Sequence, residues 1–274
     1  MSDKPTEKEI LESIKDSGYL MEQEIASIFE NENFFVITNS AFEDDEEGKS
    51  REIDVYAHNR IYESESNKVS IFVNFICECK NNTNPFVFIG RDKNNSDKYF
   101  TPTEFVFSKN RFEQKITEKL MVVQEPFNYF HLQKSHHFFQ TKQKAVQFCK
   151  IVRNGKNWKA MHDGIYDSIF IPLVKALEYH KKKQKNYNSS VTLNYPIVVL
   201  NSDIFYVDSN NPENLTSVDH ITFIREIRSK NINGKYMIEF VTKKGLLEFI
   251  KEKPKKVVNQ LKKIIEAEPE SFKR

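Results

Sequence analysis

The run VSIFVNFICECK, residues 69–80, most constrains what this chain can fold into. Its nearly continuous apolar character is typical of a central strand whose two faces are both covered. Glu78 and Lys80 interrupt the run at its end. Because side chains alternate along a strand, these two charges share one face. The run predicts a mixed α/β fold around a central sheet, with a charged pair at the end of a core strand.

A second strand with a charged residue precedes this run. The segment REIDVYAHN, residues 51–59, alternates, which predicts Ile53 and Val55 on one face and Asp54 on the other. If the two strands are hairpin neighbours, Asp54 and Glu78 converge within a few ångströms. Two carboxylates at that range repel each other unless a cation lies between them.

Such an oxygen cage suits a hard divalent ion such as Mg²⁺. The backbone carbonyl of Cys79 lies between Glu78 and Lys80 in the chain and would supply a further oxygen. Lys80 would then lie beside a water activated by the metal, where it can orient the water and stabilise negative charge as a phosphodiester is attacked.

Two helices are predicted before these strands. The first, PTEKEILESIKDSG, has Thr6 and Glu9 as a capping box and Gly18 as its stop. The second covers about residues 19–31, and its apolar arc includes one acidic residue, Glu22. An acidic group on the sheet-facing side of a helix needs a partner, such as a shared metal or Lys80; the alternative is a surface glutamate at the edge of the arc.

Glu22 on a helix, Asp54 on the next-but-one strand and Glu78-Cys79-Lys80 on the strand after it resemble the PD-(D/E)XK, restriction-endonuclease-like nucleases. The resemblance is closest to the Mrr-type branch and covers about residues 15–90. It implies an αβββαβ core with a mixed central sheet flanked by helices. It also implies that Asp54 and Glu78 bind Mg²⁺, for which Mn²⁺ would substitute, that Lys80 positions the water, and that Glu22 supports the metal site.

The rest of the chain predicts a single domain over residues 1–274. We expect the catalytic core at about 15–90 and 157–250, with a peripheral helical insertion at about 91–156. Helices are predicted in RFEQKITEKLMVVQ and QTKQKAVQFCKIVRN, and a longer one from about 158 to 185, restarted or kinked at Pro172. YPIVVLNSDIFYVD predicts a β pair with an NSD turn, HITFIREI and YMIEFV predict further strands, and a terminal helical segment breaks at Pro254.

Composition narrows the class of protein. Three cysteines form no disulfide framework, and Cys77 and Cys79 have no second pair to complete a zinc site. The sequence shows neither a signal peptide nor an apolar run of membrane-spanning length, so a cytoplasmic protein is expected. A net charge of +2 neither favours nor excludes a nucleic-acid partner, since a local basic groove does not appear in a total.

Other charged stretches have simpler interpretations. FEDDEE is expected to be a solvated loop away from the DNA path, and HKKKQK an exposed helix end, with phosphate contact as the alternative. The histidines of SHHFF are expected to be structural because no third metal ligand is evident nearby. Glu78 and Lys80 themselves could be a plain ion pair.

The predicted function is a Mg²⁺-dependent endonuclease acting on DNA. The alternatives are a catalytically inactive nucleic-acid-binding module on the same fold and an interaction protein in which the pattern arose by chance. Cleavage of both strands of a duplex would call for a homodimer.

Overall fold

The computed structural model describes residues 4–117 and 120–273, and in that part of the chain twelve strands form one sheet. The strand order is β1-β2-β3-β10-β14-β13-β8-β4-β11-β12, with β5 added to β10 and β9 added to β8; β6 and β7 form a separate hairpin. The strands are β1 Phe35–Asp44, β2 Lys49–Glu63, β3 Ser70–Lys80, β4 Phe86–Asp92, β5 Phe105–Phe107, β6 Phe112–Thr117, β7 Leu120–Gln124, β8 Gln143–Asn154, β9 Asn157–Met161, β10 Ser190–Leu200, β11 Ile204–Asp208, β12 Asn211–Val218, β13 His220–Arg228 and β14 Asn233–Thr242.

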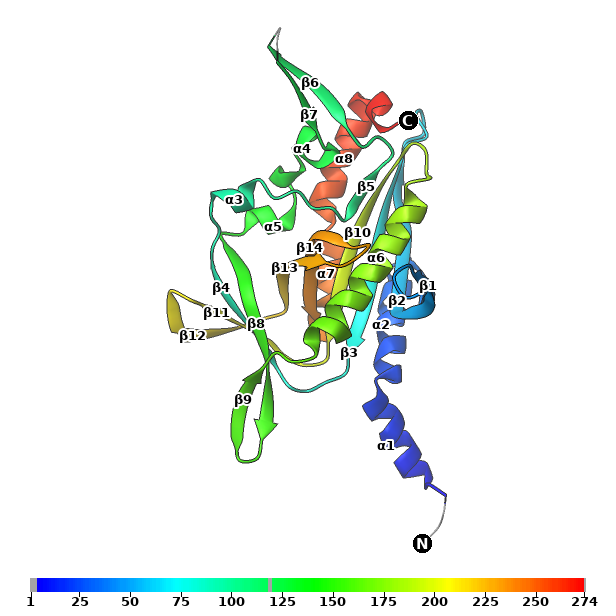
Figure 1. The fold of residues 1–274 in the computed structure, drawn as a ribbon. Coiled ribbons are helices and arrows are strands. Elements are labelled where there is room, and N and C mark those ends of the chain that lie inside the picture. Colours follow the sequence, from blue (N-terminus) through cyan, green and yellow to red (C-terminus); the bar gives the residue numbers. More distant parts are fainter. Residues whose placement is uncertain (1–3, 118–119, 274) are drawn as a thin grey trace.

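Helices cover both faces of the central strands (Figure 1). Helix α6 lies on one face, and α2, α7 and α8 lie on the other. The helices are α1 Glu7–Ser17, α2 Tyr19–Asn31, α3 Asn95–Lys98, α4 Pro126–Tyr129, η1 Leu132–Lys134, α5 His137–Gln140, η2 Tyr166–Phe170, α6 Ile171–Gln184, η3 Lys243–Gly245, α7 Leu246–Glu252, α8 Lys255–Ala267 and η4 Pro269–Phe272. The mixed α/β class with a large sheet between helices is therefore confirmed. No helix in the described ranges combines the length and the apolar character that a membrane span requires.

The N-terminal elements follow their local sequence signals. Thr6 and Glu9 form the expected capping box of α1, and Gly18 ends the helix in the left-handed conformation with φ 90°. Helix α2 has the predicted bounds and buries Met21 and Ile25 with two further apolar residues. Strand β3 contributes to cores on both sheet faces, as expected for a central strand.

The sequence prediction for residues 91–156 is wrong in its secondary structure. The segment contains short helices, but RFEQKITEKLMVVQ forms the β6–β7 hairpin, apart from Glu118 and Lys119, which lie outside the described residues. QTKQKAVQFCKIVRN forms β8, which pairs with β4 and β13 inside the main sheet. Residues 91–156 are thus largely β-structure, and part of them belongs to the central layer.

Two later predictions also change. The expected helix over 158–185 begins only at Tyr166, and strand β9 occupies residues 157–161. The π-helical segment η2 precedes α6, which starts at Ile171 with Pro172 in its first turn, so the predicted restart at this proline is confirmed. The β10 and β11 strands do not pair with each other as predicted: β10 lies between β3 and β14, and β11 pairs with β4 and β12. The terminal helical segment does break at Pro254, between α7 and α8.

Halfway along β2, the side-chain alternation is interrupted, so that Ile53 and Val55 point to opposite faces of the sheet. Asn39 in β1 has φ 50°, a left-handed conformation that asparagine tolerates, and no pair is formed between Thr38↔Val55 and Ser40↔Ile53. Val55 packs in the core under α2, whereas Ile53 packs in the core under α6. The predicted alternation with Ile53 and Val55 on one face is therefore wrong, because the ladder is interrupted where Asn39 lies opposite Asp54.

Candidate functional site

The β2–β3 ladder ends where the predicted site begins. Its last pair at this end is Val55↔Cys77, although β2 continues back to Lys49 and β3 continues to Lys80. The next step of the same register sets Asp54 opposite Glu78. Instead of a ladder bond, the Cys79 N–H donates a hydrogen bond of 2.6 Å to Asp54 Oδ2. Asp54 therefore lies at the opening between two strands that have stopped pairing.

Glu78 and Lys80 share a face, as predicted. Lys80 Nζ donates to Glu78 Oε1 at 2.5 Å, and Glu78 is 8 % exposed. The ion pair expected as the simple interpretation is thus present. It uses one oxygen of Glu78 and one of the three N–H donors of the lysine, which leaves donors on Lys80 for a further partner.

The backbone of Cys79 faces this opening. In an extended strand the N–H and C=O of one residue point to the same side, and those of the next residue point to the other. The Lys80 carbonyl accepts from the Asn201 N–H on the β10 side, whereas the Cys79 N–H points to Asp54. The Cys79 carbonyl therefore faces Asp54, where a cation ligand was predicted.

The thiols take no part in this arrangement. Cys77 is buried in the core under α2, and Cys79 packs against the same core. Burial raises the pKa of both thiols, and neighbouring carboxylates raise it further. A thiol must lose its proton to bind zinc, so burial in the core and the raised pKa both disfavour zinc binding by these two cysteines.

Glu22 approaches the cluster from the first turn of α2. The pKa of Glu22 is raised, first by partial burial and then by Asp54, while Lys80 lowers it. Among the described residues, however, Glu22, Asp54 and Glu78 do not bring three carboxylate oxygens within 4.8 Å of one another. Glu22 thus belongs to the electrostatic field of the site and is not in a position to share one ion with both other carboxylates.

The corner between α1 and α2 packs against the end of β3. A Cβ on Gly18 would lie 3.3 Å from Asn81 Cβ, and Asn81 Nδ2 donates to the Lys15 carbonyl at 2.7 Å. Asn201 Nδ2 donates to Asn81 Oδ1 at 2.9 Å from the end of β10. Asn81, the residue that follows Lys80, is therefore fixed by hydrogen bonds to the end of α1 and to the residue after β10.

The carboxylates of the cluster are short of positive charge. Burial raises the pKa of Glu78 to about 7, helped by Asp54 and Glu22 and opposed by Lys80. Burial also raises the pKa of Asp54, against the Cys79 hydrogen bond and Lys80. One lysine shared among three carboxylates leaves a local excess of negative charge, and oxygen donors in such a field fit a hard divalent cation.

The acidic segment FEDDEE is only in part the solvated loop that was expected: Asp45 and Glu47 lie in an exposed turn, but Asp44 ends strand β1 and is buried. Asp44 is 1 % exposed and accepts from Arg51 Nε at 2.5 Å and from Lys175 Nζ of α6 at 2.7 Å. Burial raises the pKa of Asp44, but Lys175 and Arg51 outweigh it and lower the pKa to about 2. This network ties the β1–β2 hairpin to α6, and both cations are provided by the protein itself.

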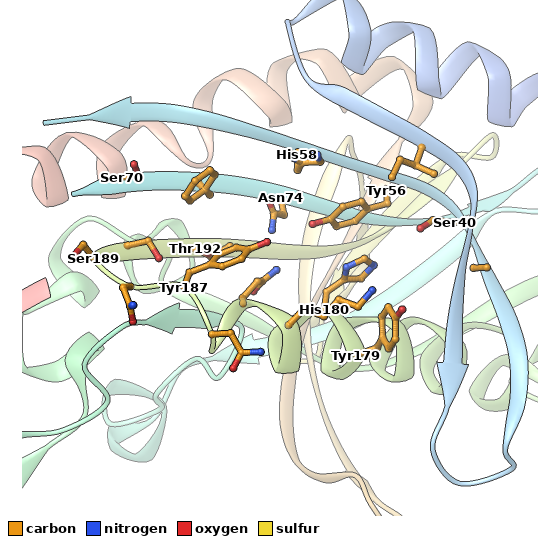
Figure 2. A pocket seen from close by; sticks show the side chains of 18 of the residues that line it. Ser40, Tyr56, His58, Ser70, Asn74, Tyr179, His180, Tyr187, Ser189 and Thr192 are labelled. Atoms are coloured by element: carbon orange, nitrogen blue, oxygen red, sulfur yellow. The ribbon is translucent and has the colours of Figure 1, made fainter. Parts of the chain in front are cut away.

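The basic end of α6 is also more buried than predicted. His180 is 8 % exposed and stacks on Tyr56 with 3.9 Å between ring centroids, while Lys182 pairs with Asp45. Beside this stack lies a cavity of about 840 Å³, bounded by β2, β3, β10 and the segment after α6 (Figure 2). The prediction missed this cavity. The signal was Tyr56 and His58 alternating with apolar residues on β2.

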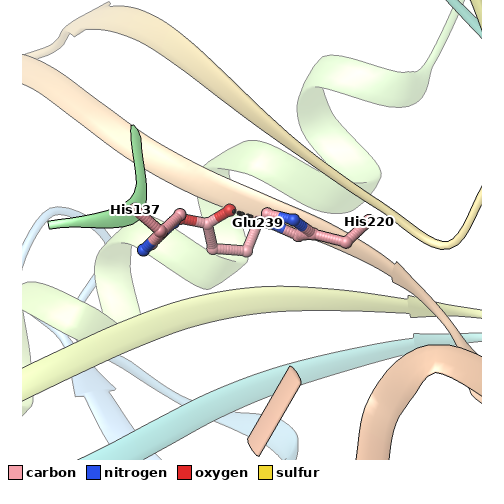
Figure 3. Close-up of side chains that lie close together, drawn as sticks. All are labelled: His137, His220 and Glu239. Atoms are coloured by element: carbon pink, nitrogen blue, oxygen red, sulfur yellow. Dashed lines mark hydrogen bonds and ion pairs between the residues drawn. The ribbon is translucent and has the colours of Figure 1, made fainter. Parts of the chain in front are cut away.

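The histidines of SHHFF divide into two environments. His136 is buried among aromatic rings, in agreement with a structural role. His137 meets His220 and Glu239, and in the described ranges this is the one group of three side chains that brings His, Cys, Asp or Glu ligand atoms within 4.8 Å (Figure 3). Sequence reasoning missed it because the partners are 83 and 102 residues away along the chain (220 − 137 and 239 − 137).

Of the four predicted residues, the structure brings Asp54, Glu78 and Lys80 to one opening at the end of the β2–β3 ladder and places Glu22 at its border. The arrangement offers oxygen ligands on one side and an ammonium on the other. It can hold a hard cation and orient a water next to it. Comparison of the chain with protein-family models, with curated proteins and with solved structures finds no match.

Proposed function

We propose that this chain is a Mg²⁺-dependent endonuclease that hydrolyses phosphodiester bonds of DNA. The observation that carries the proposal is the opening at the end of the β2–β3 ladder. There Asp54 and Glu78 lie on adjacent strands with too little positive charge, and Lys80 contacts Glu78 at 2.5 Å. Structural ion pairs such as that of Asp44 are neutralised within the protein, whereas this cluster is not.

The order of elements supports the same interpretation. Helix α2 is followed by the antiparallel strands β1, β2 and β3, and β10, which follows α6, joins β3 in parallel. This succession agrees with the αβββαβ core implied by the resemblance to PD-(D/E)XK nucleases. The other strands, from β4 to β9 and from β11 to β14, extend the sheet or lie outside it.

In this proposal Asp54, Glu78 and the Cys79 carbonyl hold the ion, and Mn²⁺ substitutes for Mg²⁺. The bound ion supplies Lewis-acid stabilisation of the phosphate and a lower pKa for water. Lys80 keeps one N–H on Glu78 and uses the others to orient the attacking water and to stabilise the charge that develops on the phosphate. Glu22 adds negative potential that favours retention of the cation.

The test is cleavage of supercoiled plasmid, single-stranded DNA and RNA in Mg²⁺, in Mn²⁺ and in EDTA. We expect cutting of DNA that is lost in EDTA and reduced by roughly 10²–10³-fold in Lys80→Ala, the usual effect of removing one charge-stabilising donor. Asp54→Ala should reduce it at least as much. Glu30→Gln, an exposed carboxylate near the end of α2, is the matched control and should cut normally.

Cutting that persists in EDTA or in both variants would contradict the proposal. DNA binding without cutting by the wild-type protein would instead identify the inactive binding module. Conversion of plasmid directly to the linear form would indicate that two copies act together, and a molar mass twice that of the 32.4 kDa chain would agree with a homodimer.

A further inference from the structure

A second buried carboxylate lies on β14, between two imidazoles and apart from the Asp54–Glu78 cluster. Glu239, in β14, is 1 % exposed, and its Oε1 lies 2.8 Å from His137 Nε2. Its Oε2 lies 2.6 Å from His220 Nε2 and accepts a hydrogen bond of 2.8 Å from Thr222 Oγ1. Figure 3 shows the carboxylate between the two rings.

The backbone fixes this constellation. Thr222 is the direct partner of Glu239 in the β13–β14 ladder, and His220, two residues earlier in β13, shares its face. His137 is the first residue of α5 and reaches Glu239 from outside the sheet. Two ligands therefore stand on neighbouring strands of a rigid sheet, the kind of support that a preorganised metal site requires.

We propose that His137 Nε2, His220 Nε2 and one oxygen of Glu239 bind a transition-metal ion, with Zn²⁺ as the best fit. The three ligand atoms lie within 4.8 Å of one another, and imidazole with a carboxylate suits zinc, whereas magnesium prefers oxygen ligands alone. The site is separate from the Asp54–Glu78 cluster and does not depend on the nuclease proposal.

Three protein ligands would leave a fourth coordination position open, and both histidines border a cavity. Its volume is about 250 Å³, and His137, His220 and Thr222 line it together with Lys144, Tyr206 and Lys253. Closed structural zinc sites use four protein ligands, so this arrangement is of the open kind, which binds water or a small anion. Lys144 is paired with Asp97 at 2.6 Å, so Lys253 is the lysine that gives the cavity wall a positive charge suited to an anion.

One feature sets the expected strength of the site. His137 Nδ1 is buried without a hydrogen-bond partner in the described part of the chain. Metal-binding histidines generally donate this second N–H to an acceptor, and loss of such a partner weakens binding roughly 10–100-fold. We therefore expect affinity below that of structural zinc sites. Glu239 does have its outer partner in Thr222, which orients the carboxylate.

The experiment measures Zn²⁺ and Co²⁺ binding to the full chain after chelator treatment. Asp54→Asn with Glu78→Gln is used throughout, to remove the other cation site. We expect one Zn²⁺ per chain by calorimetry, a visible Co²⁺ spectrum of a four- or five-coordinate ion, and a higher Tm with Zn²⁺. In this background, His220→Asn and, separately, Glu239→Gln should weaken Zn²⁺ binding at least roughly 100-fold.

His131→Asn is the control, because His131 is an exposed histidine. Its backbone has the left-handed conformation, which an asparagine at this position can also adopt. This variant should bind Zn²⁺ like the background protein. If the background protein, folded by circular dichroism, binds no Zn²⁺ and gives no Co²⁺ band, the cluster is a hydrogen-bonded core network and the proposal fails. It fails equally if folded His220→Asn binds Zn²⁺ with unchanged affinity.

Discussion

Asp44 and Glu78 are both buried carboxylates that accept a hydrogen bond from a lysine, yet they differ in charge balance. Asp44 has Lys175 at 2.7 Å and Arg51 at 2.5 Å, and together they bring its pKa down to about 2 despite burial. Glu78 has Lys80 at 2.5 Å, but burial and Asp54 raise its pKa to about 7. Burial and a salt bridge are common to both acids, and the sum of nearby charges is what separates them; on this difference rests the proposal that Glu78 binds a cation.

The largest expected effect is on stability, at Asp44. Asp44→Asn leaves Lys175 buried without its main counter-charge, which should cost roughly 3 kcal/mol in the free energy of unfolding, measured with urea. Asp45→Asn, the exposed neighbour that pairs with Lys182, is the control and should cost under about 1 kcal/mol. Equal losses in the two variants would remove the distinction between the two clusters.

The same aspartate predicts how stability depends on acid. The pKa of Asp44 is lowered in the folded protein, so its contribution is complete above the unfolded value near 3.8 and is lost as pH falls towards 2. Asp44→Asn should therefore differ most from wild type above about pH 4, and the two unfolding curves should approach each other in more acidic solution. A difference that is constant with pH would contradict this origin of the stability.

Glu78 has a raised pKa, in contrast to the lowered pKa of Asp44, and cation binding at Glu78 should therefore depend on pH near neutrality. Because the pKa of Glu78 is raised to about 7, the ion must displace a proton below that pH. We expect the Mg²⁺ concentration for half-maximal cleavage to rise about tenfold for each pH unit below 7 and to level off above it. Magnesium titrations at pH 6, 7 and 8 measure this, and an unchanged midpoint would show that Glu78 is not a ligand.

The smallest expected effect is the stability of Asp54→Asn. The amide oxygen keeps the hydrogen bond from Cys79, and the change removes one of the repelling charges. Without metal, we expect a free energy of unfolding equal to that of wild type or up to about 1 kcal/mol higher, although cleavage is lost. A loss comparable to that of Asp44→Asn would assign Asp54 to the structure and not to a cation site.

The predictions that succeeded depend on signals close together in the sequence. Thr6, Glu9 and Gly18 define α1 by capping chemistry alone, and Pro254 separates two helices for the same local reason. The proximity of Asp54 and Glu78 followed from the adjacency of two consecutive strands, although the alternation predicted for β2 fails between Ile53 and Val55. Such adjacency is the commonest arrangement of sequential strands.

The failed prediction for β6–β7 missed a local hairpin, whereas that for β8, besides its hairpin with β9, involves long-range pairing. In β8, a register shift leaves Val146 between the paired residues Ala145 and Gln147, so that the buried side chains Ala145 and Phe148 fall three apart. That interval imitates the period of a helix, although the segment is a strand with a bulge. Its partners, β4 and β13, lie far away in sequence and gave no local signal.

The electrostatics of the acidic segment were unpredictable for a similar reason. Lys175, which neutralises Asp44, is 131 residues away along the chain, so composition could not separate a neutralised acidic hairpin from a solvated one. The His137–Glu239–His220 group has the same property. In both cases the sequence supplies suitable residues, but the fold decides which of them meet.

The hydrogen bonds that hold the Asn81 side chain have a practical consequence for work with the protein. Asn81 directly follows Lys80, and its side chain forms hydrogen bonds with the carbonyl of Lys15 at the end of α1 and with the side-chain amide of Asn201 after β10. A truncation that begins at α2 would remove the first of these anchors while leaving every catalytic candidate in the chain. Removal of α1 would thereby alter the position of Lys80 from a distance, and protein that retains α1 is the appropriate reference in any assay.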